Sequence, residues 1–410
     1  TDLVELIQRC LLREAKERPS AENIVDSLRM FLFQSGPAPM GEANPFRGLL
    51  PFTEQQAGFF FGRDEEIGGF VERLRMVPVL PVVGPSGAGK SSFVLAGVIP
   101  RLHEQSRWHV VHVKPGNRPF DTLSMQLNAA DSMITIQNSV DPETGEVQDD
   151  ADDARDLYFG SLAAELAESP ARLAMRLQEI AEQRASRVLL VVDQLEELYT
   201  LVEDEAVRLR FMESICGAAD DPFGPVRVVF TVRDDFLGRV AETEAARRVL
   251  QNIIVLRSPE PEALREIVVR PLVKVGYRYE DEHLPEEMLL AVRGEPACLP
   301  VLQFTCAQLW TMRDKGRKVL TRAAYEELGG VEGALARHTE KTIESLSPRQ
   351  LVIARQLFLR LVTPERTRRV VSRSHLLDGI TDDEVSVDDV GEVLQRLIQD
   401  RAIVVRRSLG

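Results

Sequence analysis

Segments dominated by apolar residues alternate along the chain with segments whose apolar positions repeat every three to four residues. The apolar segments lie at residues 80–83, 108–113, 188–192, 226–232 and 253–256. Strands with apolar residues on both faces are typical of a parallel sheet that helices cover on both sides. Their alternation with amphipathic segments predicts strand–helix repeats, and therefore an α/β fold with a parallel sheet.

Two prolines, Pro78 and Pro81, fall in or next to the first apolar segment. Proline lacks the N–H group that a central strand uses in its ladder. We therefore expect this strand to be short, from about Leu80 to Val83.

The periodicity divides the chain into five parts. Residues 1–34 predict two helices, and residues 35–76 hold a linker rich in proline and glycine followed by a phenylalanine-rich stretch. The strand–helix repeats fill residues 77–257, whereas residues 258–340 have a helical pattern throughout. Residues 341–410 predict a helix, a basic segment, two more helices and a last apolar stretch, an order typical of a winged helix. The expected architecture is an α/β domain, then an all-α helical domain, then a winged-helix domain.

Composition narrows the class of protein. The chain has 410 residues, a formal net charge of −14 and 44% hydrophobic residues, values typical of a soluble globular protein with two or three domains. The acidic balance disfavours a general binder of nucleic acid or anionic membranes. No apolar run reaches the roughly 18 residues of a membrane span, so we expect a cytoplasmic protein. The opening Thr1 suggests a fragment of a longer chain.

Residues Gly84–Ser91 read GPSGAGKS and match the phosphate-binding pattern of Gly, four residues, Gly, Lys and Ser or Thr. They follow an apolar strand and open a helix, as phosphate binding requires. Glycines let the backbone aim its N–H groups into one concavity, and the helix N-terminus adds further donors. The residues expected to contact a nucleotide here are Gly84, Ser86, Gly87, Ala88, Gly89, Lys90, Ser91 and Ser92.

Within this loop, Lys90 supplies a cation for the β- and γ-phosphates, and the hydroxyl of Ser91 can join the shell of a bound Mg²⁺. A carboxylate facing the same ion is expected at the end of a neighbouring buried strand. Asp193 directly follows the apolar run at 188–192 and fits that position. The sequence therefore predicts a site for ATP or ADP, with Mg²⁺ held by Ser91 and Asp193.

The stretch FFGRDEE at residues 60–66 lies about twenty residues before the phosphate loop. This combination resembles the STAND class of P-loop NTPases, which is related to AAA+, NACHT and NB-ARC proteins, and especially the bacterial branch fused to Ser/Thr protein kinases. The resemblance extends over residues 46–410 by the order of motifs. It implies that Phe61, Gly62 and Arg63 lie at the adenine base. Alternatively, the phenylalanines fasten the linker to the core.

The resemblance also implies that Glu196 polarises the attacking water. Glu197 competes for this role, and either residue could be only an acid at a helix N-terminus. The usual pair of adjacent acids is missing, because Gln194 follows Asp193. The catalytic base therefore stays open between Glu196, Glu197 and neither.

Two further residues resemble elements of the same class. Arg233 ends the strand VRVVFTV and resembles a TxR sensor, which would tell ATP from ADP because only the third phosphate satisfies its charge. A surface salt bridge to Asp234 or Asp235 is the alternative. Pro300, after Leu299 at a helix start, resembles a GxP element that packs against the adenine or ribose. Proline in a first helical turn also has an ordinary explanation.

Residues 10–28, CLLREAKERPSAENIVDSL, resemble the last helices of a eukaryotic-type Ser/Thr kinase domain. A free-standing helical hairpin is the alternative. The sequence has no glycine-rich kinase loop, HRD or DFG motif, so this chain is not itself a kinase.

Together these features predict an ATP-dependent signalling switch with slow, Mg²⁺-dependent hydrolysis. ADP would hold the domains closed, and ATP would promote an open, self-associating form. The resemblance implies an upstream kinase domain and C-terminal sensor repeats in the full-length chain. Two alternatives stay open: a scaffold that binds nucleotide without hydrolysis, and a winged-helix DNA-binding regulator.

The winged helix carries the main basic cluster of the sequence, made up of Arg366, Arg368, Arg369 and Arg373. The negative net charge of the chain favours a packing role for this domain over DNA binding, so nucleic acid is not an expected partner. Residues 141–156 are rich in acids and turn formers, and we expect a dispensable, solvated loop there.

Overall fold

The structure is a computed structural model. It describes residues 44–135, 162–295, 298–334 and 346–361, and a few short pieces at 343, 371, 376, 389–391, 393–394 and 397. The expected N-terminal helices, the acidic loop at 141–156 and the basic cluster at 366–373 lie outside the described residues.

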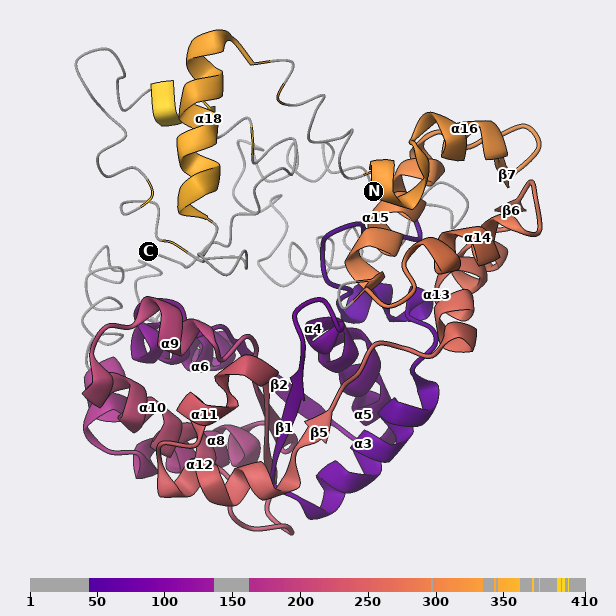
Figure 1. Ribbon diagram of the computed structural model, residues 1–410. Coiled ribbons are helices and arrows are strands. Elements are labelled where there is room, and N and C mark those ends of the chain that lie inside the picture. Colours follow the sequence, from indigo (N-terminus) through magenta and orange to yellow (C-terminus); the bar gives the residue numbers. More distant parts are fainter. Residues whose placement is uncertain are drawn as a thin grey trace, which may run out of the picture.

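A five-stranded parallel sheet forms the centre of the first domain (Figure 1). Its spatial order is β2-β3-β4-β1-β5, so the strand that precedes the phosphate loop lies between β4 and β5. The strands are β1 (Val79–Gly84), β2 (Trp108–Val113), β3 (Arg187–Val192), β4 (Val226–Arg233) and β5 (Ile254–Val255). The apolar pattern thus predicted all five strands and their parallel arrangement.

Helices cover both faces of this sheet, as Figure 1 shows. Side chains alternate along β3: Leu189 and Val191 pack with α3, η3 and α5, whereas Val188, Leu190 and Val192 pack with α6, α8, α10 and α12. The helices of this domain are η2 (Glu54–Phe59), α3 (Asp64–Met76), α4 (Lys90–Ser92), η3 (Phe93–Val98), α5 (Ile99–Gln105), α6 (Pro119–Thr135), α8 (Ala171–Gln183), α9 (Glu197–Leu201), α10 (Glu205–Gly217), η4 (Asp234–Phe236), α11 (Leu237–Val240), α12 (Glu244–Val249) and η5 (Leu250–Asn252).

Strand β1 is longer than expected, because it tolerates Pro81 in its middle. Alternate residues of a parallel strand bond to opposite neighbours, and Val83 accepts a bond from Leu256 N on the β5 side. Pro81, two residues earlier, faces the same side. The pairing with β5 begins only at Val82, so the missing N–H of Pro81 leaves no ladder bond unmade.

The second domain follows β5 and is helical with one exception. Its elements are α13 (Pro261–Lys274), β6 (Arg278–Tyr279), α14 (Leu284–Ala291), α15 (Cys298–Thr311), β7 (Val319–Leu320) and α16 (Arg322–Glu327). Strands β6 and β7 form a two-stranded parallel sheet, so the expected all-α character is wrong at this point. A strand of two residues is too short to leave a recognisable period in the sequence.

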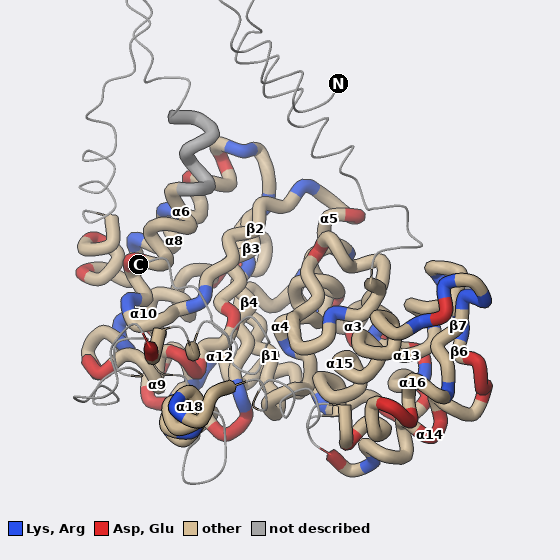
Figure 2. Tube along the Cα trace, turned by 90° about the horizontal axis from the view of Figure 1, so that it is seen from above, with Lys and Arg blue, Asp and Glu red and all other residues tan. Residues whose placement is uncertain are grey.

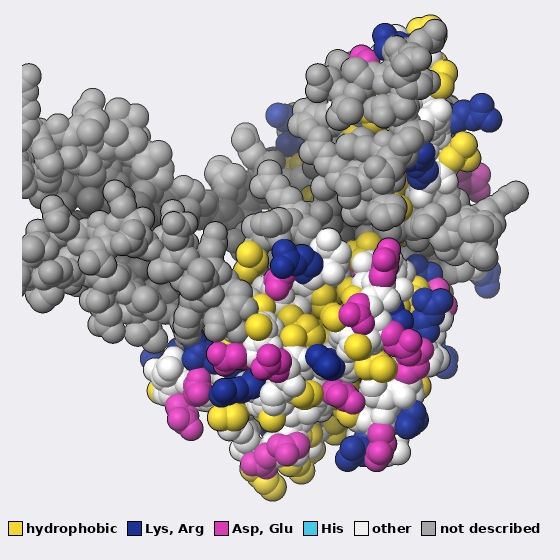
Figure 3. Space-filling view, turned by 90° about the vertical axis from the view of Figure 1, so that its left-hand side faces the viewer, with side chains coloured by type: hydrophobic (Ala, Val, Ile, Leu, Met, Phe, Trp, Pro, Cys, Tyr) yellow, Lys and Arg dark blue, Asp and Glu magenta, His cyan; other side chains and the backbone are white. Residues whose placement is uncertain are grey.

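Charged side chains flank this small sheet, and Figure 2 shows acidic and basic stretches beside each other around β6 and β7. Arg317 binds Glu280 at 2.8 Å and Arg322 binds Asp281 at 2.6 Å. On the face of the molecule in Figure 3, acidic, basic and apolar side chains are likewise interspersed. Exposed pairs of this kind contribute little stability individually.

Beyond residue 340 the described part contains α18 (Pro348–Arg360), which begins with a capping box formed by Ser347 and Gln350. Its buried residues Ile353, Ala354 and Leu357 belong to a core with Leu376, Val390, Val393, Leu394 and Leu397. The winged helix stays a prediction, because most of residues 362–410 lie outside the described part. In the described ranges, no helix combines the length and the apolar character needed to cross a membrane.

A fully buried arginine closes the end of the sheet opposite the phosphate loop. Arg227, in β4, is 0% exposed and donates to the carbonyls of Leu74, Arg75, Pro222, Gly224 and Val226. The first two belong to the last turn of α3, where unpaired carbonyls give the helix its negative end. The Arg227 guanidinium thus links the last turn of α3 to the sheet, one face of which α3 covers.

We expect Arg227→Met to lower the free energy of unfolding by roughly 3 kcal/mol, because several buried carbonyls lose a donor at about 1 kcal/mol each. Urea denaturation followed by circular dichroism measures this change. Arg75→Met is the matched control, because that side chain is half exposed, and its effect should stay within about 0.5 kcal/mol. Equal stabilities of the two variants would contradict the role of Arg227.

Candidate nucleotide site

The candidate site forms where three parallel strands end. Gly84 of β1 lies in register with Arg233 of β4, and Asp193 directly follows β3, the other neighbour of β4. Ligand sites of open parallel sheets lie at the carboxyl ends of the strands. The topology therefore brings the phosphate loop, the expected carboxylate and the expected sensor arginine to one edge of the sheet.

The phosphate loop needs its glycines for two separate reasons. Gly87 and Gly89 have φ values of 84° and 86°, which glycine adopts readily and other residues do not. Gly84 allows a close approach, because a Cβ there would lie 2.3 Å from the carbonyl oxygen of Leu256. Within the loop Ser86 is exposed and Ala88 is buried.

Lys90 folds over the loop. Its Nζ donates to the carbonyls of Gly84 at 2.7 Å and Pro85 at 2.9 Å, which holds the ammonium where phosphates are expected. Burial lowers the pKa of Lys90, and the negative charges of Glu196, Asp234 and Asp193 oppose this change. This desolvated ammonium can make a charge-assisted contact with an incoming phosphate.

Asp193 is the central group of the site. Its Oδ1 accepts hydrogen bonds of 2.7 Å from both Ser91 and Thr231. Its Oδ2 lies 3.8 Å from the Lys114 ammonium and 3.9 Å from Nε2 of His112. These contacts join the phosphate loop with the ends of β2, β3 and β4.

This environment keeps Asp193 ionised. Burial by itself would raise the pKa of the carboxyl group, which is 1% exposed. The neighbouring His112 and Lys114, followed by the hydroxyls of Thr231 and Ser91, outweigh burial and lower the pKa to about 2.

The residues present fit a Mg²⁺ ion. Asp193 Oδ2 is buried and has no hydrogen-bond partner among the described residues, and the Ser91 hydroxyl lies beside the other oxygen of the same carboxylate. Mg²⁺ prefers oxygen ligands and commonly takes one or two from the protein, with phosphates and water completing the shell. Ser91 and Asp193 are therefore the residues that would hold it.

Glu196 and Glu197 occupy different environments. Glu196 is the N-cap residue of α9; burial raises its pKa, and its charge acts directly on Lys90. Its Oε2 is buried without a hydrogen-bond partner in the described ranges. Glu197 is 4% exposed within the first turn of α9. A carboxylate with a raised pKa beside the phosphate-binding lysine is better suited to accept a proton, which favours Glu196.

Arg233 makes the salt bridge that the sequence left open as an alternative to the sensor role. Its Nε donates to Asp235 Oδ1 at 2.9 Å and its Nη2 to Asp235 Oδ2 at 2.5 Å. The guanidinium also lies 5.5 Å over the ring of Phe236. The sensor role stays a prediction, and a phosphate can take the Nε–Nη2 edge of the guanidinium only by displacing Asp235.

The expected adenine segment lies against α13. A Cβ at Gly62, whose φ is 77°, would come within 2.6 Å of the Ala263 carbonyl. The guanidinium of Arg270 stacks 4.4 Å from the centre of the Phe61 ring. Glycine at position 62 is thus required for the second domain to pack closely on this segment.

Arg63 is a brace between two parts of the protein backbone. Its guanidinium is 3% exposed and donates to the Ala88 carbonyl in the phosphate loop, the Arg257 carbonyl after β5, and Glu66. The same arginine therefore joins the phosphate loop to the connection that leads into α13.

The start of α15 also reaches the phosphate loop. Cδ1 of Leu299 lies 3.4 Å from where a Cβ on Gly89 would be, which places Pro300, the third residue of α15, in the same region. The Ser92 hydroxyl accepts the backbone N–H of Phe52 at 3.0 Å. Ser92 thus anchors the segment before α3 to the phosphate-loop helix.

Sequence reasoning missed several residues of the site. Thr231 lay inside the TxR motif without a role, yet it bonds Asp193 and accepts the N–H of Gln194. The backbone of Gln194 is in the left-handed region, with a φ of 62°. His112 and Lys114 end the second strand, and their polarity at a carboxyl end of a parallel sheet was the available signal.

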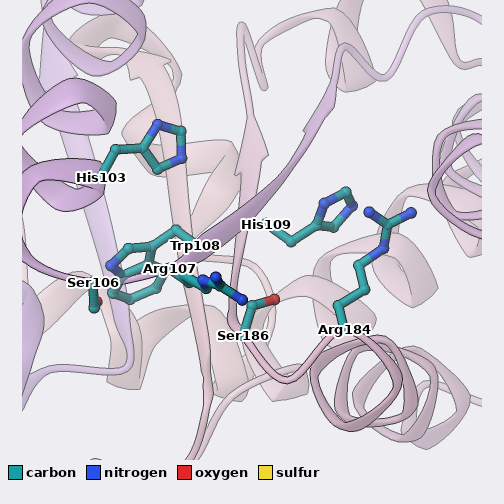
Figure 4. A pocket seen from close by; sticks show the side chains of 7 residues that line it. All are labelled: His103, Ser106, Arg107, Trp108, His109, Arg184 and Ser186. Carbon is teal, nitrogen blue, oxygen red and sulfur yellow. The ribbon is translucent and has the colours of Figure 1, made fainter. Parts of the chain in front are cut away.

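A separate hollow of about 400 Å³ lies at the opposite edge of the sheet (Figure 4). Its lining includes Trp108, the first residue of β2, and Ser186, which precedes β3. Strand starts and strand ends lie at opposite edges of a parallel sheet, so this hollow is distinct from the candidate nucleotide site.

We expect Lys90→Ala to weaken ATP binding about ten- to a hundredfold, because one charge-assisted phosphate contact contributes roughly 1.5–3 kcal/mol. Calorimetric titration measures the affinity, with circular dichroism to check the fold. The exposed Lys315 provides the control variant Lys315→Ala, which should bind as the native protein does. Unchanged affinity in a folded Lys90→Ala variant would exclude the phosphate role.

We expect Glu196→Gln to slow hydrolysis about 10²- to 10⁴-fold, the usual contribution of a general base, while ATP binding persists. In the native protein hydrolysis should rise with pH through a pKa above the ordinary glutamate value of 4.5, because the base acts only when deprotonated and its pKa is raised. Phosphate release measures both effects. Glu197→Gln is the matched control, and a larger loss there would reassign the base.

Comparison with known proteins places the chain in a family. The sequence profile of the family "Novel STAND NTPase 1" matches residues 45–409. No curated protein matches the sequence. Solved structures with a similar chain course include a Walker-type ATPase of Pyrococcus abyssi, 16% identical with a TM-score of 0.45, covering 88% of this chain and 94% of that one.

Two proteins of Aeropyrum pernix show similar values. ORC1, solved in complex with DNA, is 14% identical with a TM-score of 0.44, covering 85% of this chain and 86% of that one. ORC2, solved with ADPNP and ADP, is 13% identical with a TM-score of 0.46, and the match covers 87% of this chain and 89% of that one. Similarity this distant says nothing further about the present chain. The family match covers nearly all of the sequence from the phenylalanine-rich stretch onward, and the protein therefore belongs to the Novel STAND NTPase 1 family.

Proposed function

We propose that this protein is an ATP-dependent signalling switch. ADP holds the sheet domain and the helical domain together in a closed form, and ATP favours an open, self-associating form with slow hydrolysis as the reset. The observation that carries this proposal is the position of the phosphate loop: Lys90 bonds to Gly84 at the end of β1, and Gly89 lies beside Leu299 at the start of α15. A nucleotide bound there would touch both domains, so its identity can bias how they sit together.

The brace at Arg63 supports this coupling. It binds one carbonyl in the phosphate loop and one in the connection between the domains, at 3.1 and 2.7 Å. The segment before α3 adds two contacts of the same kind: Arg47 N donates to Gln303 in α15, and Phe52 N donates to Ser92 in the phosphate-loop helix. A change of backbone position at the phosphates is therefore transmitted to the helical domain through direct bonds.

The same residues would carry out the hydrolysis of ATP. Lys90 and Arg233 neutralise the charge that develops on the transferred phosphoryl group, and Glu196 accepts the proton of the attacking water. A Mg²⁺ ion held by Ser91 and Asp193 would stabilise the phosphate oxygens. In this proposal Thr231 and Lys114 keep Asp193 fixed and ionised.

The partners are part of the proposal. The stretch at 10–28 and its likeness to a kinase C-terminus support coupling to an upstream Ser/Thr kinase in the full-length chain. The cytoplasm is the proposed location. A role of the C-terminal domain in packing rather than DNA binding is favoured by the acidic charge of the whole.

We expect Arg233→Ala to weaken binding of a non-hydrolysable ATP analogue about ten- to a hundredfold more than binding of ADP, because a bidentate charged contact contributes about 1–3 kcal/mol. Calorimetry with both nucleotides measures this difference. Arg239→Ala is the matched control, because its guanidinium lies at a similar distance, 5.6 Å, over the same Phe236 ring. Equal losses for both nucleotides would make Arg233 a structural residue.

We also expect the native protein to form larger species in sedimentation velocity with the ATP analogue than with ADP. Arg233→Ala should resist this assembly, because its open form gains less from the third phosphate. Sedimentation that is the same in both nucleotides would contradict the switch and favour a nucleotide-bound scaffold instead.

A further inference from the structure

The turn after β4 presents Arg233 with a carboxylate that copies the contact geometry of a phosphate. Asp235 takes the guanidinium through both of its oxygens, one on Nε and one on Nη2. These are two parallel bonds of the fork-to-fork type that arginine makes with carboxylates and phosphates alike. While Asp235 occupies these donors, the same edge of Arg233 cannot serve a nucleotide.

The pair lies beside the phosphate loop. Arg233 is in register with Gly84, and the charges of Arg233 and Asp234 both act on Lys90. The Arg233 side chain is 19% exposed and that of Asp235 is 51% exposed. The carboxylate is therefore the more solvent-exposed partner of the pair.

The ring of Phe236 supports the guanidinium in this position, 5.5 Å from its centre. The same ring contacts Tyr199 of α9, with ring centres 6.4 Å apart. Since α9 follows Glu196 directly, the support of the arginine and the position of the candidate base belong to one packed unit.

We propose that Asp235 is a tethered competitor of the γ-phosphate and thereby sets the preference of the site for ATP over ADP. This inference rests on the proposed function, in which Arg233 senses the third phosphate. With ADP, Asp235 keeps the guanidinium; with ATP, the γ-phosphate displaces it, because a phosphate carries more charge and a partly exposed ion pair is weak. Breaking the pair subtracts from the gain on binding ATP, whereas ADP binds without breaking it.

This competition determines whether removal of the Asp235 charge strengthens or weakens nucleotide binding. Removing the Asp235 charge should strengthen binding of adenylyl-imidodiphosphate about two- to fivefold, the range that exposed ion pairs contribute. ADP affinity should change less than the affinity for the analogue. A residue that merely supports the fold would weaken both nucleotides, so the direction of the change separates the two roles.

The experiment measures both affinities by calorimetry in Asp235→Asn, with circular dichroism to verify folding. Asp234→Asn is the matched control: it removes the same charge one position earlier and retains an oxygen for the bond from Asp235 N. The bidentate partner of Arg233 is Asp235, not Asp234. The control variant should change the affinities for both nucleotides by the same factor and leave the ratio of the two affinities unchanged. The double variant Arg233→Ala/Asp235→Asn should show the ratio of Arg233→Ala alone, because the competition requires the arginine.

Three results would overturn the inference. In the first, Arg233→Ala lowers the ratio of ATP-analogue affinity to ADP affinity, but Asp235→Asn leaves this ratio unchanged. Arg233 would then still be the sensor, and Asp235 would not be its competitor. A shift of the ratio by Asp235→Asn that persists in the Arg233→Ala background would mean a general charge effect. If Arg233→Ala itself leaves the ratio unchanged, the sensor role in the proposed function fails and the inference fails with it.

Discussion

The hydrogen bonds of one buried carboxylate hold the candidate site together. Asp193 accepts from the phosphate loop through Ser91 and from β4 through Thr231, and its own backbone N–H bonds to Val113 at the end of β2. Four elements are thus fixed relative to one another by one residue. Such a group must stay ionised and paired, because a buried charge without partners would cost several kcal/mol.

That requirement explains why cations gather around this carboxylate. The chain as a whole is acidic, with a net charge of −14, yet Lys90, Lys114 and Arg233 gather at one edge of the sheet. Lys90 and Lys114 offset the charges of Asp193 and Glu196 at close range, and Arg233 is paired with Asp235. Long-range attraction of the whole surface matters less here than contacts within a Debye length of about 8–10 Å.

Several contacts to the backbone tie the second domain to this edge of the sheet. Arg63 binds two carbonyls in separate parts of the chain, and Gly62 lets α13 approach the backbone closely. Directed bonds of this kind are either made or lost, so they suit a coupling with two discrete states. The guanidinium of Arg270 over the Phe61 ring adds a cation–π contact between the same two parts.

The sequence by itself determined the parallel sheet, the phosphate loop and the position of Asp193, because each depends on local order: an apolar strand, then glycines, then a helix. It also located Arg233 at a strand end. Only the tertiary structure decided which partners these residues take. Arg63 is a brace between domains, Thr231 and Lys114 fix Asp193, and Asp235 holds Arg233. These contacts join strands that lie far apart in the chain, and the register and order of the sheet, which no local pattern encodes, set which side chains meet.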